Sequence, residues 1–147
     1  MTERYDWEYR KLGDFTYHIL QQSQIKPFLM KHLKREWETD HAEFPDQKST
    51  IEWLALLPKM EFTLEILELG DIRLRQDVMD YRTDTYDFKA SLRQRANVRE
   101  ESFIRGVSTE PLVVNGDGME LMDGYTRYIV LRDHRQEKVY AYVGQVK

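Results

Sequence analysis

The stretch that decides the fold of this chain is Asp123-Gly124-Tyr125-Thr126-Arg127-Tyr128. It follows a segment with the pattern of a β-hairpin, residues 111–122, and leads into an apolar-periodic segment, residues 128–134, that predicts a helix. A glycine turn between a strand and a helix exposes backbone N–H groups at the positive end of the helix dipole, which suits a phosphate group. Arg127 falls where a guanidinium could complete such a site. A plain turn and cap is the competing interpretation, because Asp-Gly before a helix is common.

The composition indicates a folded protein with a charged surface. A length of 147 residues fits one domain, or one domain with an appendage, and 12% of the residues are aromatic, which argues against disorder. No apolar run approaches the roughly 18 residues of a membrane span, and the charged start of the chain lacks the apolar core of a signal peptide. The absence of cysteine excludes disulfides, thiolate metal sites and a cysteine nucleophile. We therefore expect a cytoplasmic protein with no membrane partner.

The net charge of -4 argues against broad nucleic-acid binding, which requires a basic surface, so DNA is an open but not a favoured partner. Basic residues nevertheless crowd the middle of the chain, at Arg73, Arg75, Arg82, Lys89, Arg93, Arg95, Arg99 and Arg105. We expect most of them on the solvated face of a helix, with a rim that attracts anions as the alternative.

The first 60 residues predict a helical N-terminal extension. Helical spacing of apolar residues favours a first helix over 4–22, and Pro27 fits the first turn of a second helix that ends near Asp40. The pattern Ser-Thr-Ile-Glu at 49–52 is typical of a capping box before a third, short helix. The aromatic residues of this extension cap the core, or they form a surface for a protein partner or a second copy of the chain.

The rest of the chain predicts a small sheet with packed helices, an α+β class. Phe62, Leu64 and Ile66 alternate with polar residues, as in a strand with one buried face. The other expected elements are a turn at Gly70-Asp71, a helix from Thr83 or Asp84 to about Val98, a short helix over 99–105 that Gly106 ends, strands at 112–114, 119–122 and 139–143, and a hairpin turn at 115–118.

Two groups of polar residues could bind metal ions. His32 and Glu36 share a helical face near Asp40 and His41, but the HExxH pattern is absent and we expect no metal site there. The second group would suit a nuclease, although caps and solvated turns are the simpler role for its members, Asp77, Asp80, Asp84 and Asp87.

Five segments in this order resemble the ParB N-terminal-domain/sulfiredoxin superfamily. They are Phe62–Arg75, Pro111–Val114, Glu120–Arg127, Leu131-Arg132 and Val139–Val143. The resemblance covers about residues 61–147, where we expect a ParB/sulfiredoxin-like domain, whereas residues 1–60 match no family pattern.

The resemblance implies a nucleotide site. Members of this superfamily bind a nucleoside triphosphate through a Gly-x-x-Arg segment at a helix N-terminus, which places Gly124 and Arg127 at the phosphates, with Tyr125 and Thr126 between them and Asp123 as the preceding acidic residue. Some ParB-type proteins are CTP switches that clamp DNA, sulfiredoxin uses ATP and a cysteine to repair peroxiredoxins, and another branch phosphorylates free serine.

The chain departs from the family pattern in three ways. Many active members have His, Glu, Arg or Cys where this chain has Tyr125 and Thr126, which supply neither a cation nor a nucleophile at neutral pH. The lack of cysteine excludes sulfiredoxin chemistry. The sequence also stops where ParB proteins continue into a helix-turn-helix segment, so we expect no centromere binding of the usual kind.

Three functions follow from these patterns. The first is a nucleotide-dependent phosphotransferase or NTP hydrolase, with Asp123 or Glu110 as general base, Arg127 balancing phosphate charge, and Mg²⁺ clamping ATP, CTP or ADP. The second is a non-catalytic regulatory or protein-interaction module of the same fold, suggested by Tyr125 and Thr126. The third is a ParB-like nuclease. Phosphate or nucleotide binding at the Asp123-Gly124-x-x-Arg127 turn is the main expectation, with catalysis left open, whereas the second function would bind a protein or a nucleotide.

Overall fold

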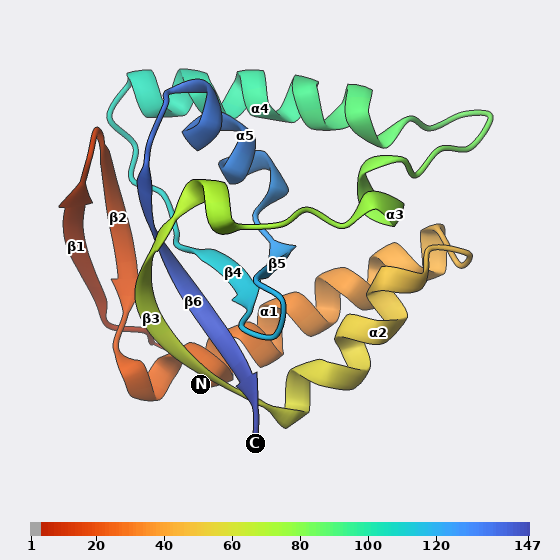
Figure 1. Cartoon of the computed structure of the whole chain (residues 1–147), viewed down its shortest axis with the longest axis horizontal. Coiled ribbons are helices and arrows are strands. Elements are labelled where there is room, and N and C mark those ends of the chain that lie inside the picture. Colours follow the sequence, from red (N-terminus) through yellow and green to blue (C-terminus); the bar gives the residue numbers. More distant parts are fainter. Residues whose placement is uncertain (1–3) are drawn as a thin grey trace.

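A computed structural model describes residues 4–147 (Figure 1). In chain order its elements are β1 (Trp7–Leu12), β2 (Phe15–Leu20), α1 (Gln22–Glu43), α2 (Lys48–Leu56), a 3₁₀ turn (Leu57–Lys59), β3 (Met60–Glu68), a 3₁₀ turn (Leu69–Asp71), α3 (Gln76–Met79), α4 (Phe88–Ile104), β4 (Leu112–Asn115), β5 (Glu120–Asp123), α5 (Tyr125–Asp133) and β6 (Lys138–Val146). The expected α+β class is confirmed.

A four-stranded sheet of order β3-β6-β4-β5 organises the fold. β6 pairs antiparallel with β3 and parallel with β4, and β4 pairs antiparallel with β5. Residues 139–144 of β6 are buried throughout, as expected for a central strand covered on both faces. In Figure 1, α4 runs along one side of the molecule and α1 with α2 along the other, with the sheet and the β5–α5 segment between them.

The first 60 residues share one hydrophobic core with the sheet domain. Ile25, Leu29 and Leu33 of α1 and Trp53 of α2 belong to the same buried cluster as the strands. β2 is also joined to the loop before β4, where the His18 N–H donates to the Thr109 carbonyl at 2.8 Å. This packing brings α1 to one side of the β5–α5 turn.

The predicted helix over residues 4–22 is wrong, because this stretch forms the β1–β2 hairpin. Its strands pair in register from Trp7 with Leu20 to Leu12 with Phe15, around a turn in which Gly13 has a φ of 60°. Buried Phe15, Tyr17 and Ile19 alternate with more exposed residues, the period of a half-buried strand. The sequence carried this signal in Gly13-Asp14 between two aromatic runs, which outweighs the accidental helical spacing.

Two helix starts in the first 60 residues also differ from the prediction. α1 begins at Gln22 rather than near Pro27, so the proline lies inside the helix and costs it one backbone hydrogen bond. α2 begins at Lys48 with Gln47 as its cap, and no side chain caps it. The expected capping box is therefore absent, and Ser49 is buried without a partner for its hydroxyl among the described residues.

The helix after residue 80 starts later and runs farther than expected. Asp87, not Thr83 or Asp84, is its cap, and the Asp87 carboxylate accepts from the Ala90 N–H at 3.3 Å. α4 is then continuous to Ile104, which is exposed rather than inward-facing. Gly106, with a φ of 82°, ends the helix as predicted.

The strands of the sheet and the glycine turn follow the prediction closely. β3, the hairpin of β4 and β5, and β6 all form where the sequence indicated, and α5 follows Gly124 directly. The buried face of β3 is shorter than expected, since Phe62 is buried but Ile66 is 52% exposed. Within residues 4–147, no helix has both the length and the apolarity needed to cross a bilayer.

Candidate functional site

The residue before α5 occupies a position that only glycine can take without strain. Gly124 caps the helix with a φ of 98°, and the cap supplies no side-chain acceptor for the first backbone N–H groups. A Cβ at this position would lie 2.8 Å from Arg127 Nη2 and 2.9 Å from Leu112 Cδ2. The missing side chain thus lets the Arg127 guanidinium fold back against the turn.

Arg127 is held by groups from both sides of the turn. Its Nη2 donates to Asp123 Oδ2 at 3.0 Å and to the Pro111 carbonyl at 3.4 Å, while Nη1 lies 3.8 Å from Glu110 Oε2. The side chain is only 11% exposed. The structure thus brings together Asp123, Gly124, Arg127 and Glu110, as the sequence predicts, but both carboxylates first serve to position the guanidinium.

Glu110 belongs to a further polar contact with the β1–β2 hairpin. Its Oε1 lies 3.3 Å from His18 Nε2, and His18 Nδ1 lies 2.9 Å from the Ser108 hydroxyl oxygen. This contact orients the Glu110 side chain beside Arg127. The sequence did not single out His18, because the erroneous helix placed it far from the turn.

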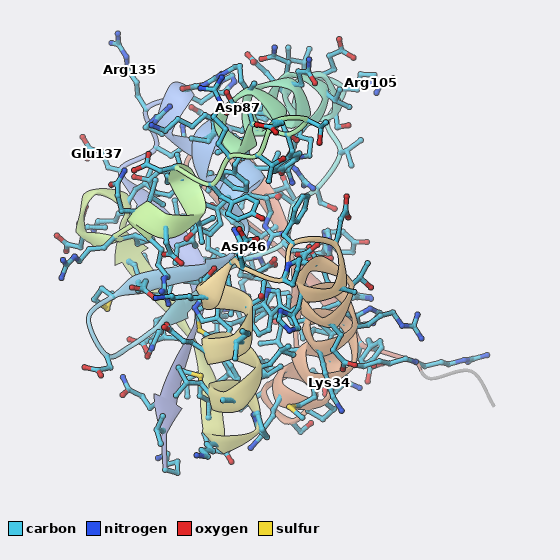
Figure 2. The ribbon with its side chains drawn as sticks, turned by 90° about the vertical axis from the view of Figure 1, so that its right-hand side faces the viewer. Lys34, Asp46, Asp87, Arg105, Arg135 and Glu137 are labelled. Atoms are coloured by element: carbon cyan, nitrogen blue, oxygen red, sulfur yellow. The ribbon has the colours of Figure 1, made fainter. Side chains whose placement is uncertain are left out.

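The turn opens into a cavity of about 900 Å³ between α1 and α4. The residues that matter most for its chemistry are Glu36 and Asp40 from α1, Arg95 and Arg99 from α4, and Thr126 and Arg127 from α5. Figure 2 views the molecule from the side where Asp46, in the α1–α2 connection, and Asp87, at the start of α4, face the reader. A volume of this size can hold a nucleotide-sized ligand.

The α1 wall of the cavity is acidic. Although Glu36 is exposed, the cavity walls remove much of the bulk water around its carboxyl. This desolvation and the negative charges of Asp123 and Asp40 raise the pKa of Glu36 to about 7, and the positive charge of Arg127 opposes the shift only in part. Desolvation likewise raises the pKa of Asp40. Glu36 entered the sequence analysis only as a potential metal ligand, since nothing local places it opposite Arg127.

The α4 wall of the cavity is basic. Arg95 and Arg99 lie one helical turn apart, and neither forms an ion pair with any residue that the structure describes. Desolvation and then the charge of Arg127 lower the pKa of Arg99. Of the arginines considered for a rim that attracts anions, Arg95 and Arg99 line the cavity, whereas Arg75 and Arg93 pair with carboxylates elsewhere.

Two N–H groups of residues that line the cavity are buried and lack an acceptor within residues 4–147. They are Arg127 Nε and Trp53 Nε1, and the Trp53 residue is only 4% exposed. Neither group can accept a hydrogen bond. An unpaired buried donor costs about 1–3 kcal/mol, so these two groups favour a ligand rich in oxygen acceptors.

Tyr125 and Thr126 differ in what they offer a ligand. The Tyr125 ring is buried, and its hydroxyl donates to the Leu121 carbonyl at 3.1 Å and accepts from the Arg75 N–H at 3.3 Å. Burial raises the pKa of this hydroxyl. Tyr125 can therefore contribute its backbone but not its hydroxyl, whereas the half-buried Thr126 side chain lines the cavity.

The described residues contain no group of three or more histidines, aspartates and glutamates arranged to hold a metal ion. Three of the four aspartates considered for a nuclease have structural partners: Asp77 pairs with Arg75 at 2.8 Å, Asp80 pairs with Lys89 at 3.0 Å, and Asp87 caps α4. The fourth, Asp84, is exposed.

Comparison with known proteins adds a likeness of fold. No protein-family model and no curated protein matches the chain. One similar solved structure is the C2221 form of a pNOB8-like ParB-N domain, with 17% identity, a TM-score of 0.42, and coverage of 60% of this chain and 32% of that one. Another, a pNOB8-like ParB N-domain, has 17% identity and a TM-score of 0.43, with 60% and 29% covered.

These similar structures bear the name of the fold family that the sequence motifs of residues 61–147 resemble. This chain spans about a third of the length of the solved chains. At this identity the likeness concerns the fold alone, so the function has to be argued from the site itself.

Proposed function

We propose that the protein binds the phosphate groups of a nucleotide at the Asp123-Gly124-x-x-Arg127 turn, inside the cavity between α1 and α4. The observation that carries the proposal is the buried, unpaired Arg127 Nε beside the uncapped N-terminus of α5. Helix N-terminal N–H groups and a guanidinium donor together form a common setting for phosphate oxygens.

The charges of the α4 wall support an anionic ligand. Arg99 and Arg127 are close enough for the charge of Arg127 to lower the pKa of Arg99, and Arg95 lies one turn away without an ion-pair partner among the described residues. A phosphate group placed among these guanidinium groups would remove their mutual repulsion. The donors of Arg127 and Trp53 that lack an acceptor are compatible with the same kind of ligand.

The carboxylates of the α1 wall shape how such a ligand would be bound. Glu36 and Asp40 form no ion pair with another described residue, and their charges oppose a bare phosphate. Because the described residues hold no ready metal cluster, Mg²⁺ would enter as part of a nucleotide complex, with phosphate oxygens and water as its main ligands and these two carboxylates beside it.

Catalysis would make the protein a phosphotransferase or NTP hydrolase. Asp123 and Glu110 both hold Arg127, so Glu36, with a pKa of about 7 and no ion-pair partner among the described residues, is the better-suited proton acceptor. The alternative is a non-catalytic regulatory module. It is favoured by the direct Asp123–Arg127 pair, which neutralises inside the protein the charge that a transition state would need.

Calorimetric titration with magnesium complexes of ATP, CTP, GTP and ADP tests the proposal. We expect binding by the wild-type chain and a loss of roughly tenfold in Arg99→Gln, since one charge-assisted contact is removed. Arg105→Gln, an exposed arginine just beyond α4 that does not line the cavity, is the matched control and should bind as the wild type does. Absence of binding at millimolar nucleotide would refute the proposal.

Turnover separates the two forms of the function. Release of phosphate by the wild-type chain, lost in Glu36→Gln with binding retained, would establish the catalytic form. Binding without phosphate release or transfer to any added acceptor would instead support the regulatory module.

A further inference from the structure

Three aromatic side chains form a stack at one end of the same cavity. Phe44 ends α1, and Tyr81 and Tyr86 belong to the segment that precedes α4. The Phe44 and Tyr86 ring centroids lie 4.6 Å apart with an angle of 32° between the planes, and the Tyr81 ring packs edge-on against Phe44, at 5.3 Å and 68°. All three residues line the cavity and are half-buried, so this aromatic stack remains partly open.

Hydrogen bonds hold the aromatic stack in place from both walls. The Tyr81 hydroxyl donates to Asp46 Oδ1 at 2.6 Å, and the Phe44 N–H donates to the Asp40 carbonyl at 2.7 Å. The Thr83 N–H donates to the Tyr86 carbonyl at 2.8 Å. In Figure 2 the labelled Asp46 marks this end of the molecule. The rings therefore form a prepared surface rather than a mobile loop.

The aromatic stack and the phosphate site are separated by about the length of a nucleotide. Glu36, Asp40 and Phe44 follow one another at intervals of four along one face of α1, which corresponds to a rise of about 12 Å from Glu36 to Phe44. Glu36 lies within the electrostatic reach of Arg127, at the phosphate end. A ligand that lies along α1 with a phosphate at Arg127 thus places its other end at Phe44.

We infer that the stack of Phe44, Tyr81 and Tyr86 is the subsite for the aromatic base of the bound nucleotide. The inference rests on the proposed phosphate site and extends it, because it assigns the opposite end of the ligand. Every nucleobase has a π-face, and stacking on aromatic side chains gives affinity with little dependence on the base. The Tyr86 hydroxyl, which has no hydrogen-bond partner within the described residues, is free to contact a base or ribose edge.

Comparing a nucleotide with a ligand that lacks the base tests the inference. The probes are magnesium ATP, magnesium CTP and magnesium tripolyphosphate, titrated by calorimetry into the wild-type chain and into Tyr86→Leu. We expect the wild type to bind the nucleotides more tightly than tripolyphosphate, and Tyr86→Leu to weaken nucleotide binding by roughly 10-fold while leaving tripolyphosphate unchanged. Tyr86→Phe, which keeps the ring, should bind nucleotides within about twofold of the wild type.

A control variant outside the cavity separates loss of the base subsite from a general loss of binding. Tyr9→Leu removes an exposed tyrosine of the hairpin, outside the cavity lining, and should bind both kinds of ligand normally. Equal wild-type affinity for nucleotides and tripolyphosphate, or equal weakening of both by Tyr86→Leu, would overturn the base subsite and leave the phosphate site standing. No binding of either ligand would overturn the proposed function and the inference with it. Thermal melts of each variant confirm that it is folded before its affinity is used.

Discussion

Replacing Gly124 with alanine should destabilise the chain through two separate effects. The first is backbone strain, because a φ of 98° is unfavourable for any residue with a Cβ and costs about 1–2 kcal/mol. The second is overlap, because the new Cβ would lie 2.9 Å from a methyl group of Leu112 and 2.8 Å from Arg127 Nη2. Leu112 is 0% exposed and cannot move aside, and overpacking of this kind costs a further ~1–3 kcal/mol.

Two other glycines separate these effects experimentally. Gly118 has a φ of 81° but no atom within 4 Å of the place that a Cβ would take, so Gly118→Ala should show the strain alone, about 1–2 kcal/mol. Gly70 has neither a positive φ nor a close neighbour, so Gly70→Ala should change stability by less than about 0.5 kcal/mol. Thermal unfolding should then give melting temperatures lowered by roughly 5–15 °C for Gly124→Ala, 2–6 °C for Gly118→Ala and about 1 °C or less for Gly70→Ala.

The order of the three melting temperatures tests whether strain and overlap both act at Gly124. If Gly124→Ala melts no lower than Gly118→Ala, the contacts with Leu112 and Arg127 do not constrain the turn, and the tight packing of the guanidinium against Gly124 is not a property of the protein in solution. If Gly70→Ala is as damaging as Gly124→Ala, glycine flexibility rather than turn geometry is responsible.

Three further experiments test the chemistry of the cavity. Because the pKa of Glu36 is raised to about 7, its carboxyl is mostly neutral at pH 6 and mostly charged at pH 8. Magnesium-free ADP should therefore bind about fivefold more weakly at pH 8 than at pH 6. In the same titrations, Glu36→Gln should show a smaller pH dependence than the wild type. The folded-state pKa is raised, so the same group also contributes stability at low pH that is lost as the pH rises through about 7. Asp123→Asn and Arg127→Ala should couple by roughly 1–2 kcal/mol in a double-mutant cycle of urea unfolding, and additive losses would mean that the 3.0 Å pair contributes nothing. Trp53→Phe keeps an aromatic ring but removes the unpaired N–H. This variant should keep its melting temperature within a few degrees of the wild type and bind the nucleotide severalfold more weakly. Unchanged affinity would show that Trp53 Nε1 does not contact the ligand.

The sequence predicts those parts of the site that depend on neighbouring residues. Gly124 needs its positive φ because a strand turns there directly into a helix, and the hairpin before it is encoded by Asn115 to Gly118. Asp123 and Arg127 meet because the left-handed turn at Gly124 joins the last residue of β5 directly to the first turn of α5. Glu110 joins them through the short connection into β4. Local sequence patterns were therefore sufficient to place the Gly124 turn and the side chains around Arg127.

The walls of the cavity could not be predicted in the same way. Glu36 and Phe44 reach the site only because α1 starts at Gln22 and packs across the sheet, which depends on β2 being a strand. Arg95 and Arg99 line the cavity because α4 packs across from α1, and no local pattern encodes that packing. The helical period of about 3.6 residues gives the residues that share a face of one helix, but the helices that face one another across a cavity are set by tertiary packing.

The Asp123–Arg127 pair bears directly on whether the turn can still bind an anion. A guanidinium has five N–H donors, and the observed contacts with Asp123, Pro111 and Glu110 all use the two terminal nitrogens. Nε remains unpaired and buried at the cavity. In our proposal a phosphate oxygen binds the α5 backbone and, after a shift of the side chain that exposes it, Nε, while the Asp123 contact with Nη2 orients the guanidinium. On this geometry Asp123 positions Arg127, and Glu36 across the cavity is the proton acceptor that we propose for the catalytic form of the function.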